Sequence, residues 1–406
     1  MSRSLKIILF PLGCLLSHVG RLTEIGKELR KRGHEVVFGG EAPSHPRTKL
    51  YIPQQQGFRL VYAKEPDYRY AWDRFEKYGW LATAWDLFRH RHWAPLDEIL
   101  EGHVQLIHRE KPDLVVGDAT ISVSTAAHIA GIPAAGVMNL YAWQFISPAS
   151  IFTPMIHTWD ALELSRLRRR VYRKYGKKQV NALRLLKNIL VIAPDLPGLY
   201  DPPTGWPKWQ PVGPIYSEVD APLPEWYDEL DDSIPNVYVT MGSTGLLDAF
   251  LRRTYEDLAK APYRFLVTTG GQVAEETVAM APPNFRIATY APGSKLLERC
   301  QAMIFHGGNG TMYQALAAGV PMIALPSHLE QKVCFRPAIK HGFGLEFSPR
   351  RVRANTLLKA LDEIIHDEGY RQAAHQFSQP IHEANGVARA ADVLEQTARE
   401  GRPVGI

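Results

Sequence analysis

Cysteine is scarce in this chain of 406 residues, which contains three: Cys14, Cys300 and Cys334. The three lie far apart, and no CxxC pair or Cys/His ligand spacing surrounds them. The sequence therefore predicts neither a disulfide framework nor a structural zinc site. A protein of the reducing cytoplasm is the expectation.

Long apolar runs are also missing. No stretch of about 18 apolar residues occurs, so a membrane-spanning helix is not expected. Residues 5–16 are apolar behind Arg3, as in a signal peptide, but they contain Pro11 and Gly13. They also lead directly into an amphipathic helix and a further strand, which is typical of a first β-α-β unit rather than a cleaved leader.

Neither sign of charge dominates the chain. It has 47 Lys and Arg residues against 42 Asp and Glu residues, and the formal net charge is +5. This mildly basic balance suits an anionic nucleotide or an acidic membrane surface and requires neither. With 45% hydrophobic and 22% charged residues, the composition is that of a globular protein. The length predicts two domains.

Tryptophan is absent after Trp226, although the chain contains nine of these residues. Aromatic residues gather instead in two stretches of the first half, 51–93 and 141–159. Core and surface packing explains many of them, but flat apolar side chains also suit a hydrophobic ligand. The residues that we expect to contact such a ligand are Trp72, Trp85, Trp143 and Phe145.

The first half begins as a parallel α/β unit. A strand, a loop, a helix and a second strand are predicted over residues 6–11, 12–20, 22–32 and 34–38. A later apolar run, 112–118, predicts another strand that ends in Asp118. Ligands of parallel sheets bind beyond the carboxyl ends of the strands, so His18 in the first loop and Asp118 are candidate functional residues.

Proline and acidic residues are dense between 194 and 235, which is typical of a connecting segment. The apolar run before it, 190–193, predicts the last strand of the first domain. We therefore predict an N-terminal domain, a linker, a C-terminal domain and a C-terminal helix that can pack back on the first domain, over residues 1–215, 216–234, 235–385 and 386–406.

The second half centres on a glycine-rich turn. A buried strand is predicted at 302–305, followed by the turn His306-Gly307-Gly308-Asn309-Gly310-Thr311 and a helix at 312–318. Unpaired N–H groups and the dipole at a helix start favour a phosphate group, and glycine lets the backbone approach it. A tight strand-to-helix connection is the alternative explanation of this turn taken alone.

Further motifs surround the turn. Tyr290-Ala291-Pro292 precedes it, and Gly319-Val320-Pro321 and Glu330-Gln331 follow it. This order resembles the C-terminal donor signature of the UDP-glycosyltransferase family, including bacterial macrolide and sterol glycosyltransferases. The resemblance implies the GT-B fold, in which two Rossmann-like parallel-sheet α/β domains face each other across a cleft. It also implies inverting transfer of a sugar from a nucleotide diphosphate to an acceptor hydroxyl.

The resemblance implies a role for each candidate residue. His18 would act as the general base, and Asp118 would orient its ring. The turn and Ser243 would bind the diphosphate, Ala291 the nucleobase, and the acid-Gln pair the sugar hydroxyls, unless that pair caps a helix. The expected donor-binding residues are Ser243, Ala291, His306, Gly308, Asn309, Gly310, Thr311, Glu330 and Gln331.

The chain has no Asp-x-Asp pair, so we predict no metal ion at the diphosphate. No cofactor is expected besides the cosubstrate, a UDP- or dTDP-sugar. Two positions depart from the family pattern. The family commonly has Gly-His followed two or three residues later by proline, whereas this chain reads Ser17-His18-Val19-Gly20-Arg21. Cys334 stands where many relatives carry asparagine.

Three hypotheses follow for the function. The first is a metal-independent, inverting hexosyltransferase that acts on a hydrophobic small molecule such as a polyketide, terpenoid, sterol or phenol. The second replaces this acceptor by a membrane lipid, with the basic stretch 166–178 docking a cytoplasmic protein on anionic lipid, although a solvated helix face explains that stretch more simply. The third is a GT-B helper protein that binds a nucleotide sugar without turnover. No nucleic-acid motif occurs, and the oligomeric state stays open.

Overall fold

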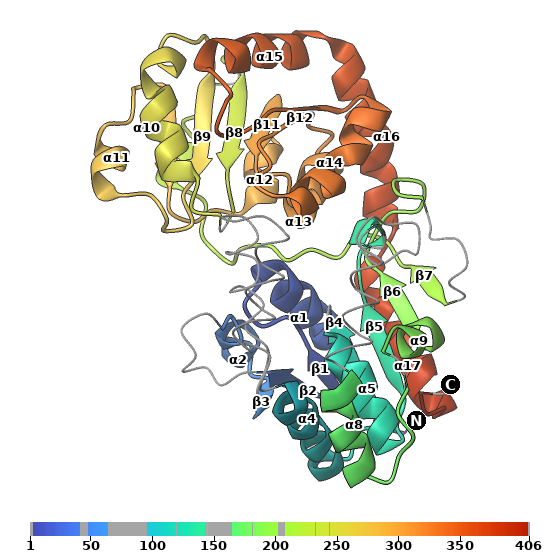
Figure 1. The fold of residues 1–406 in the computed structure, drawn as a ribbon. Helices are drawn as coiled ribbons and strands as arrows, with labels where there is room; N and C mark the ends of the chain where they lie inside the picture. Colours follow the sequence, from blue (N-terminus) through green and yellow to red (C-terminus); the bar gives the residue numbers. More distant parts are fainter. Residues whose placement is uncertain are drawn as a thin grey trace. The chain divides into compact units, whose positions relative to one another are not determined.

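The computed structural model of the chain describes residues 3–404, apart from 41–47, 64–95, 119, 143, 145–164, 181, 202–207, 232 and 243. The chain forms two compact units. Unit 1 consists of Met1–Ile215 and Asn385–Ile406, and unit 2 of Tyr216–Ala384. Each unit is built on its own parallel sheet, and Figure 1 labels the elements.

Unit 1 contains a seven-stranded sheet with the order β3-β2-β1-β4-β5-β6-β7. Its strands are β1 (Lys6–Phe10), β2 (Glu35–Gly40), β3 (Arg59–Tyr62), β4 (Leu114–Asp118), β5 (Ala134–Val137), β6 (Leu190–Ala193) and β7 (Trp209–Pro211). Most are short apolar runs, which is typical of a parallel sheet covered on both faces. Strand β4 lies next to β1, with Gly117 opposite Phe10.

Most of the helices that the structure describes in unit 1 lie between successive strands along the chain. They are α1 (Leu16–Lys31), α2 (Tyr51–Gln55), α4 (Leu96–Glu110), α5 (Ile121–Ala130), the short η1 (Leu140–Ala142), α8 (Ser165–Lys174), α9 (Ala182–Asn188) and α17 (Gly386–Glu400). Among the described residues, no helix is long and apolar enough to cross a membrane.

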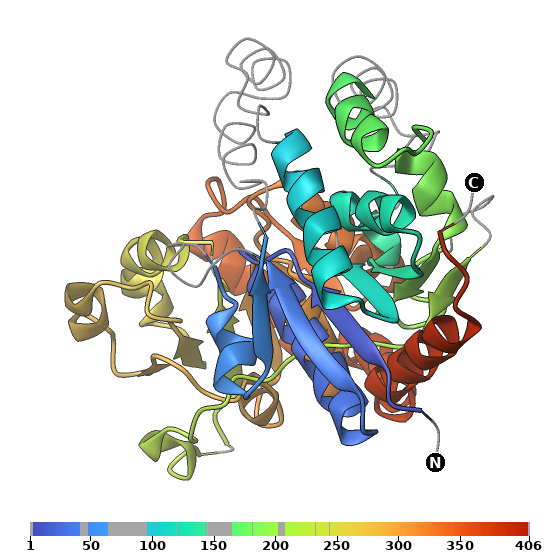
Figure 2. The same cartoon turned by 90° about the horizontal axis from the view of Figure 1, so that it is seen from below.

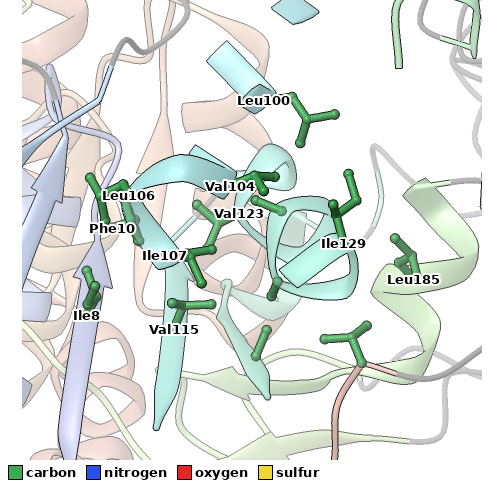
Figure 3. Packing of buried hydrophobic residues seen from close by; sticks show 14 of the residues in the cluster. Ile8, Phe10, Leu100, Val104, Leu106, Ile107, Val115, Val123, Ile129 and Leu185 are labelled. Carbon is green, nitrogen blue, oxygen red and sulfur yellow. The ribbon is translucent and has the colours of Figure 1, made fainter. Parts of the chain in front are cut away.

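Two hydrophobic clusters cover the two faces of this sheet, because successive strand residues point to opposite faces. Ile8 and Phe10 of β1 pack in one cluster with residues of α4 and α5, such as Val104 (Figure 3). Ile7 and Leu9 of the same strand pack in the other cluster with residues of α1 and α17. Helices α4 and α17 therefore lie on opposite sides of the sheet (Figure 2).

The last helix, α17, belongs to unit 1 although the chain reaches it only after unit 2. Arg32, which follows α1, donates hydrogen bonds to Asp392 (2.6 Å), to Glu395 (3.1 Å) and to the carbonyl of Ala388 (3.1 Å). Leu394 on the inner face of α17 is fully buried. The helix is thus held by a buried apolar stripe and by an arginine at its edge.

Two predictions for unit 1 are wrong in detail. Residues 16–20, predicted as part of a loop, begin helix α1, which places His18 in its first turn. The helix starts early because Val19 is fully buried one turn before Leu22, and its N–H already bonds the carbonyl of Leu15 (3.1 Å). In addition, the run 190–193 is not the last strand of the sheet, since β7 pairs with its outer edge.

Unit 2 contains a six-stranded parallel sheet with the order β10-β9-β8-β11-β12-β13. Its strands are β8 (Asn236–Thr240), β9 (Arg264–Thr268), β10 (Phe285–Ala288), β11 (Ala302–Phe305), β12 (Met322–Ala324) and β13 (Gly344–Glu346). Its helices are η3 (Glu225–Tyr227), α10 (Leu247–Leu258), α11 (Glu275–Ala279), α12 (Gly293–Leu297), α13 (Asn309–Ala317), α14 (Leu329–His341), α15 (Ala354–His366) and α16 (Glu368–Glu383).

The segment 216–234, expected as a linker, is part of unit 2. Trp226 donates its indole N–H to the carbonyl of Ile287 (3.4 Å), and the hydroxyl of Tyr227 donates to the carbonyl of Lys295 (3.0 Å). Arg299 in turn donates to the carbonyl of Tyr227 (3.1 Å). These bonds hold the segment against its own unit, which its content of proline and acidic residues did not indicate.

Candidate active site

His18 and Asp118 meet at the point where the strand order of unit 1 reverses. His18 follows β1, and Asp118 is the last residue of β4, the strand beside β1. Nδ1 of His18 lies 2.7 Å from Oδ1 of Asp118. The Asp118 carboxylate is fully buried, whereas 18% of the His18 side chain is exposed. Ligands of open parallel sheets bind at this kind of switch point.

A third side chain, Arg21, completes the pair and was not among the predicted site residues. Arg21 lies one turn after His18 on α1 and donates hydrogen bonds from Nε and Nη2 to the two oxygens of Asp118. Its Nη2 also lies 3.1 Å from Nδ1 of His18. The guanidinium therefore binds both oxygens of the carboxylate, which is a bidentate arrangement.

The polar cluster continues away from His18 through two further residues. Nη1 of Arg21 donates to the side-chain oxygen of Asn139. Asn139 donates its amide to Asp195 (3.0 Å), and the N–H of Leu140 donates to the second oxygen of Asp195 (2.6 Å). Arg21, Asp118, Asn139 and Asp195 are all buried. Hydrogen bonds to buried charges are necessary because an unpaired charge inside a protein is strongly unfavourable.

The charges of this cluster set the protonation of Asp118. Burial by itself raises the pKa of the Asp118 carboxyl, but the attraction of Arg21 and His18 and their hydrogen bonds outweigh it, and the pKa lies below its ordinary value. Asp118 is therefore ionised at neutral pH. An ionised carboxylate at Nδ1 favours the His18 tautomer that carries a proton there, which leaves the lone pair of Nε2 to accept a proton.

In unit 2 the glycine-rich turn occupies the equivalent switch point. Strand β11 lies beside β8, and the chain passes from β11 through residues 306–308 into α13. The predicted strand 302–305 is confirmed, and the helix begins at Asn309. Gly307 has a φ of 89°, which favours glycine. The N–H groups at the start of α13 consequently lie at the carboxyl edge of the sheet, where an anion binds favourably.

His306 is packed between glycines. A Cβ on Gly308 would lie 2.3 Å from its Nε2, and a Cβ on Gly242 would lie 2.8 Å from its Cε1. No described residue gives its buried Nδ1 a hydrogen-bond partner. Burial, with a smaller contribution from His328, lowers the pKa of His306 to about 4. At neutral pH the ring is uncharged, so it can offer a phosphate a hydrogen bond but not a counter-charge.

The other predicted donor residues lie at the same edge of unit 2. Ala291 is buried beside the exposed ring of Tyr290, directly before α12. Gln331 is buried, and its amide oxygen accepts hydrogen bonds from the N–H (2.8 Å) and hydroxyl (3.1 Å) of Ser327. This is a local contact at the start of α14, where Glu330 also lies. Cys334 is fully buried in the same helix.

Several predicted positions lie outside the described residues. They are Ser243 of the donor set and Trp72, Trp85, Trp143 and Phe145 of the acceptor set. Within the described part of the chain, no three His, Cys, Asp or Glu side chains are grouped to hold a metal ion. Metal independence remains a prediction from the sequence.

The chain is similar to known glycosyltransferases in sequence and in fold. The model of the erythromycin biosynthesis protein CIII-like C-terminal domain matches residues 257–388. A PGL/p-HBAD biosynthesis rhamnosyltransferase of Mycobacterium tuberculosis is 30% identical over 307 residues, which span 69% of this chain. The match spans 66% of that relative, slightly less than two thirds of its length.

Solved structures resemble the chain over nearly its whole length. The calicheamicin glycosyltransferase CalG4 has a TM-score of 0.75 at 20% identity and covers 99% of this chain and 100% of its own. The glycosyltransferase VinC, solved in complex with dTDP, has a TM-score of 0.72 at 19% identity and covers 98% and 100%. The predicted fold class, two parallel-sheet α/β units of the GT-B type, is confirmed.

Proposed function

We propose that the chain is a glycosyltransferase of the macrolide type that transfers a sugar from a nucleotide diphosphate to a hydroxyl of a hydrophobic natural product. The observation that carries the proposal is the pair His18–Asp118, which lies at the switch point of unit 1 with a distance of 2.7 Å. A histidine oriented by a carboxylate is suited to remove a proton from a hydroxyl.

In the proposed reaction, Nε2 of His18 accepts the proton of the acceptor hydroxyl. The acceptor oxygen forms a bond to the anomeric carbon while the bond from that carbon to the diphosphate breaks. The nucleotide diphosphate leaves with the bonding electrons, and His18 later releases its proton to solvent. Attack opposite the leaving group inverts the anomeric centre, so an α-linked donor gives a β-glycoside.

The charge that develops on the leaving diphosphate needs stabilisation. We assign this to the N–H groups at the start of α13 and to the Nε2–H of His306, which act as fixed dipoles. Fixed dipoles of this kind do not require a metal ion, in line with the missing Asp-x-Asp pair. The donor is a UDP- or dTDP-sugar, and the solved VinC complex with dTDP favours the second.

We assign acceptor binding to unit 1, because both aromatic stretches lie in the first half of the sequence. The alternative, a membrane-lipid acceptor, relies on the basic helix α8 to bind anionic lipid, and this support is weaker. Lys174 pairs with Glu101, and Arg170 lies 3.7 Å from Asp97, so α4 neutralises part of the positive charge of α8. The small-molecule acceptor is therefore the preferred form of the proposal.

The test is product formation from a panel of UDP- and dTDP-sugars with a mixed pool of hydroxylated aromatic, polyketide and terpenoid acceptors. Wild type is compared with His18→Ala and with His108→Ala, which removes an exposed histidine elsewhere in unit 1. A glycoside formed by wild type and by His108→Ala but lost in His18→Ala supports the proposal. If His18→Ala is active, His18 is not the general base. If the wild type binds the donor but forms no product, the helper-protein hypothesis is favoured.

A further inference from the structure

Arg21 stands in the stretch where the family pattern has a proline, and it is the least expected member of the candidate site. It is 5% exposed, although arginine is among the residues least often buried. Three of its nitrogens donate hydrogen bonds to the site: Nε and Nη2 to Asp118 and Nη1 to Asn139. These hydrogen bonds join Arg21 to both Asp118 and Asn139.

We propose that Arg21 is a positioning residue for His18, and that Asp195 supplies the second negative charge that lets His18 accept a proton beside it. The inference rests on the proposed function, because it concerns the base of that reaction. Arg21 orients His18 through Asp118 and opposes a positive charge on His18 directly, and neither Arg21 nor Asp195 is assigned a contact with the substrate.

The first part of the argument concerns geometry. A carboxylate held at both oxygens by one planar guanidinium cannot rotate about its Cβ–Cγ bond. Oδ1 of Asp118 accepts from Arg21 and from His18, so the orientation of the carboxylate fixes the orientation of the imidazole. His18 and Arg21 also share one face of α1, since residues three apart on a helix are neighbours. Arg21 therefore ties the first turn of α1 to the end of β4.

The second part concerns charge. The guanidinium lies 3.1 Å from Nδ1 of His18 and opposes an imidazolium there. With Arg21 and Asp118 alone, a proton on His18 would leave the buried cluster with one positive charge. Asp195 adds a second carboxylate, joined to Arg21 through Asn139, so protonation of His18 makes the cluster neutral. A neutral cluster in a low-dielectric interior is more favourable than a charged one.

The titratable groups that the printed contacts place at this cluster enter the same balance. Helix α1 contributes His18 and Arg21, strand β4 contributes Asp118, and Asp195 follows β6. Tyr141 of η1 lies near enough to Arg21 to contribute to its electrostatics. A phenol is uncharged at neutral pH, so the acids that balance Arg21 are the two carboxylates.

The test is the pH profile of kcat/KM for wild type, Asp195→Asn, Arg21→Gln and Arg21→Lys. Asp195→Asn disfavours the imidazolium, so the acidic limb moves to lower pH, by about 1 unit, and the plateau falls. Arg21→Gln removes the opposing charge, so the limb moves to higher pH by a similar amount. Arg21→Lys keeps the charge and loses the fork, so the limb stays in place while kcat falls about tenfold or more.

Arg30→Gln is the matched control, because Arg30 lies on the same helix but contacts Phe58 and the carbonyl of Gln56. It is expected to leave the profile unchanged. A merely structural role for Arg21 and Asp195 would lower the folded fraction of the variants without moving the limb. Unshifted limbs in Asp195→Asn and Arg21→Gln would overturn the proposal, and if Arg21→Gln does not fold, Asp195→Asn and Arg21→Lys decide it.

A second measurement separates this inference from the proposed function. The ring signals of His18, identified by their loss in His18→Gln, are followed by NMR over pH in protein labelled at histidine. The midpoint of the His18 titration is expected to rise in Arg21→Gln and to fall in Asp195→Asn, whether or not any acceptor is glycosylated. Absence of product from wild type would refute the proposed function, whereas midpoints that move by less than about 0.3 pH unit would refute the charge balance.

Discussion

The substitution Gly308→Ala is expected to weaken nucleotide diphosphate binding by displacing His306. Gly308 caps α13 with φ −77° and ψ 144°, a conformation that alanine adopts without strain. Its Cβ, however, would lie 2.3 Å from Nε2 and 2.9 Å from Cε1 of His306. The ring also packs closely against Gly242, so it must rotate away from its present position.

The size of the effect follows from the hydrogen bond that the displaced ring would lose. A hydrogen bond to a charged group contributes about 1.5–3 kcal/mol. That loss corresponds to a rise in Kd of roughly 10- to 150-fold. Because His306 is uncharged at neutral pH, the loss of a full counter-charge does not add to it.

The assay is isothermal titration of UDP and dTDP into wild type, Gly308→Ala, His306→Ala and the double variant. Gly102→Ala serves as the control, since nothing lies within 4 Å of a Cβ at Gly102. If alanine at 308 acts through the ring, the double variant binds no more weakly than His306→Ala. Additive losses in the double variant would refute the reasoning and mean that the Cβ blocks the phosphate itself.

Three further predictions concern unit 1. Asp118→Asn leaves the guanidinium of Arg21 buried without its counter-ion; unfolding in urea should show a loss of about 3–5 kcal/mol, and kcat/KM should fall about 10²- to 10⁴-fold. Burial lowers the pKa of His103 from 6.5 to about 4, so the unfolded chain binds one more proton in that range and stability is lost as the pH falls through it. His103→Leu should reduce this acid loss by about 3 kcal/mol, and an unchanged slope of stability against pH would contradict the assignment. Leu394→Ala, in the buried stripe of α17, should cost about 2–5 kcal/mol by thermal or urea unfolding, and a loss below about 1 kcal/mol would mean that α17 is not part of the core.

Local patterns predicted the elements that carry the candidate site. The strand 302–305 and the glycine turn after it were correctly predicted, because a buried parallel strand and a strand-to-helix turn each have a short-range signature. The approach of His18 to Asp118 was also anticipated. His18 follows the carboxyl end of β1 and Asp118 is the last residue of β4, and such ends meet at one edge of a sheet.

The rest of the cluster depends on contacts between distant parts of the chain. Arg21 lies in a predicted helix whose other charged residues are expected to face solvent. Nothing in the nearby sequence indicates that Asp118, Asn139 and Asp195 converge on it. The start of α1 was misjudged for a related reason. Val19 is buried by the tertiary structure of unit 1 rather than by any helix signal in its own neighbourhood.

The return of α17 to unit 1 reverses the order in which the two units can be completed during synthesis. Unit 2 is one continuous segment, so it has all its strands and helices once Ala384 has left the ribosome. Most of unit 1 precedes unit 2 in the chain, but its sheet face around Ile7 and Leu9 lacks α17 until the residues after Ala384 are made. During that interval the apolar face of the sheet is not covered by α17. A ribosome that stalls before α17 is made would leave a complete unit 2 attached to an incomplete unit 1.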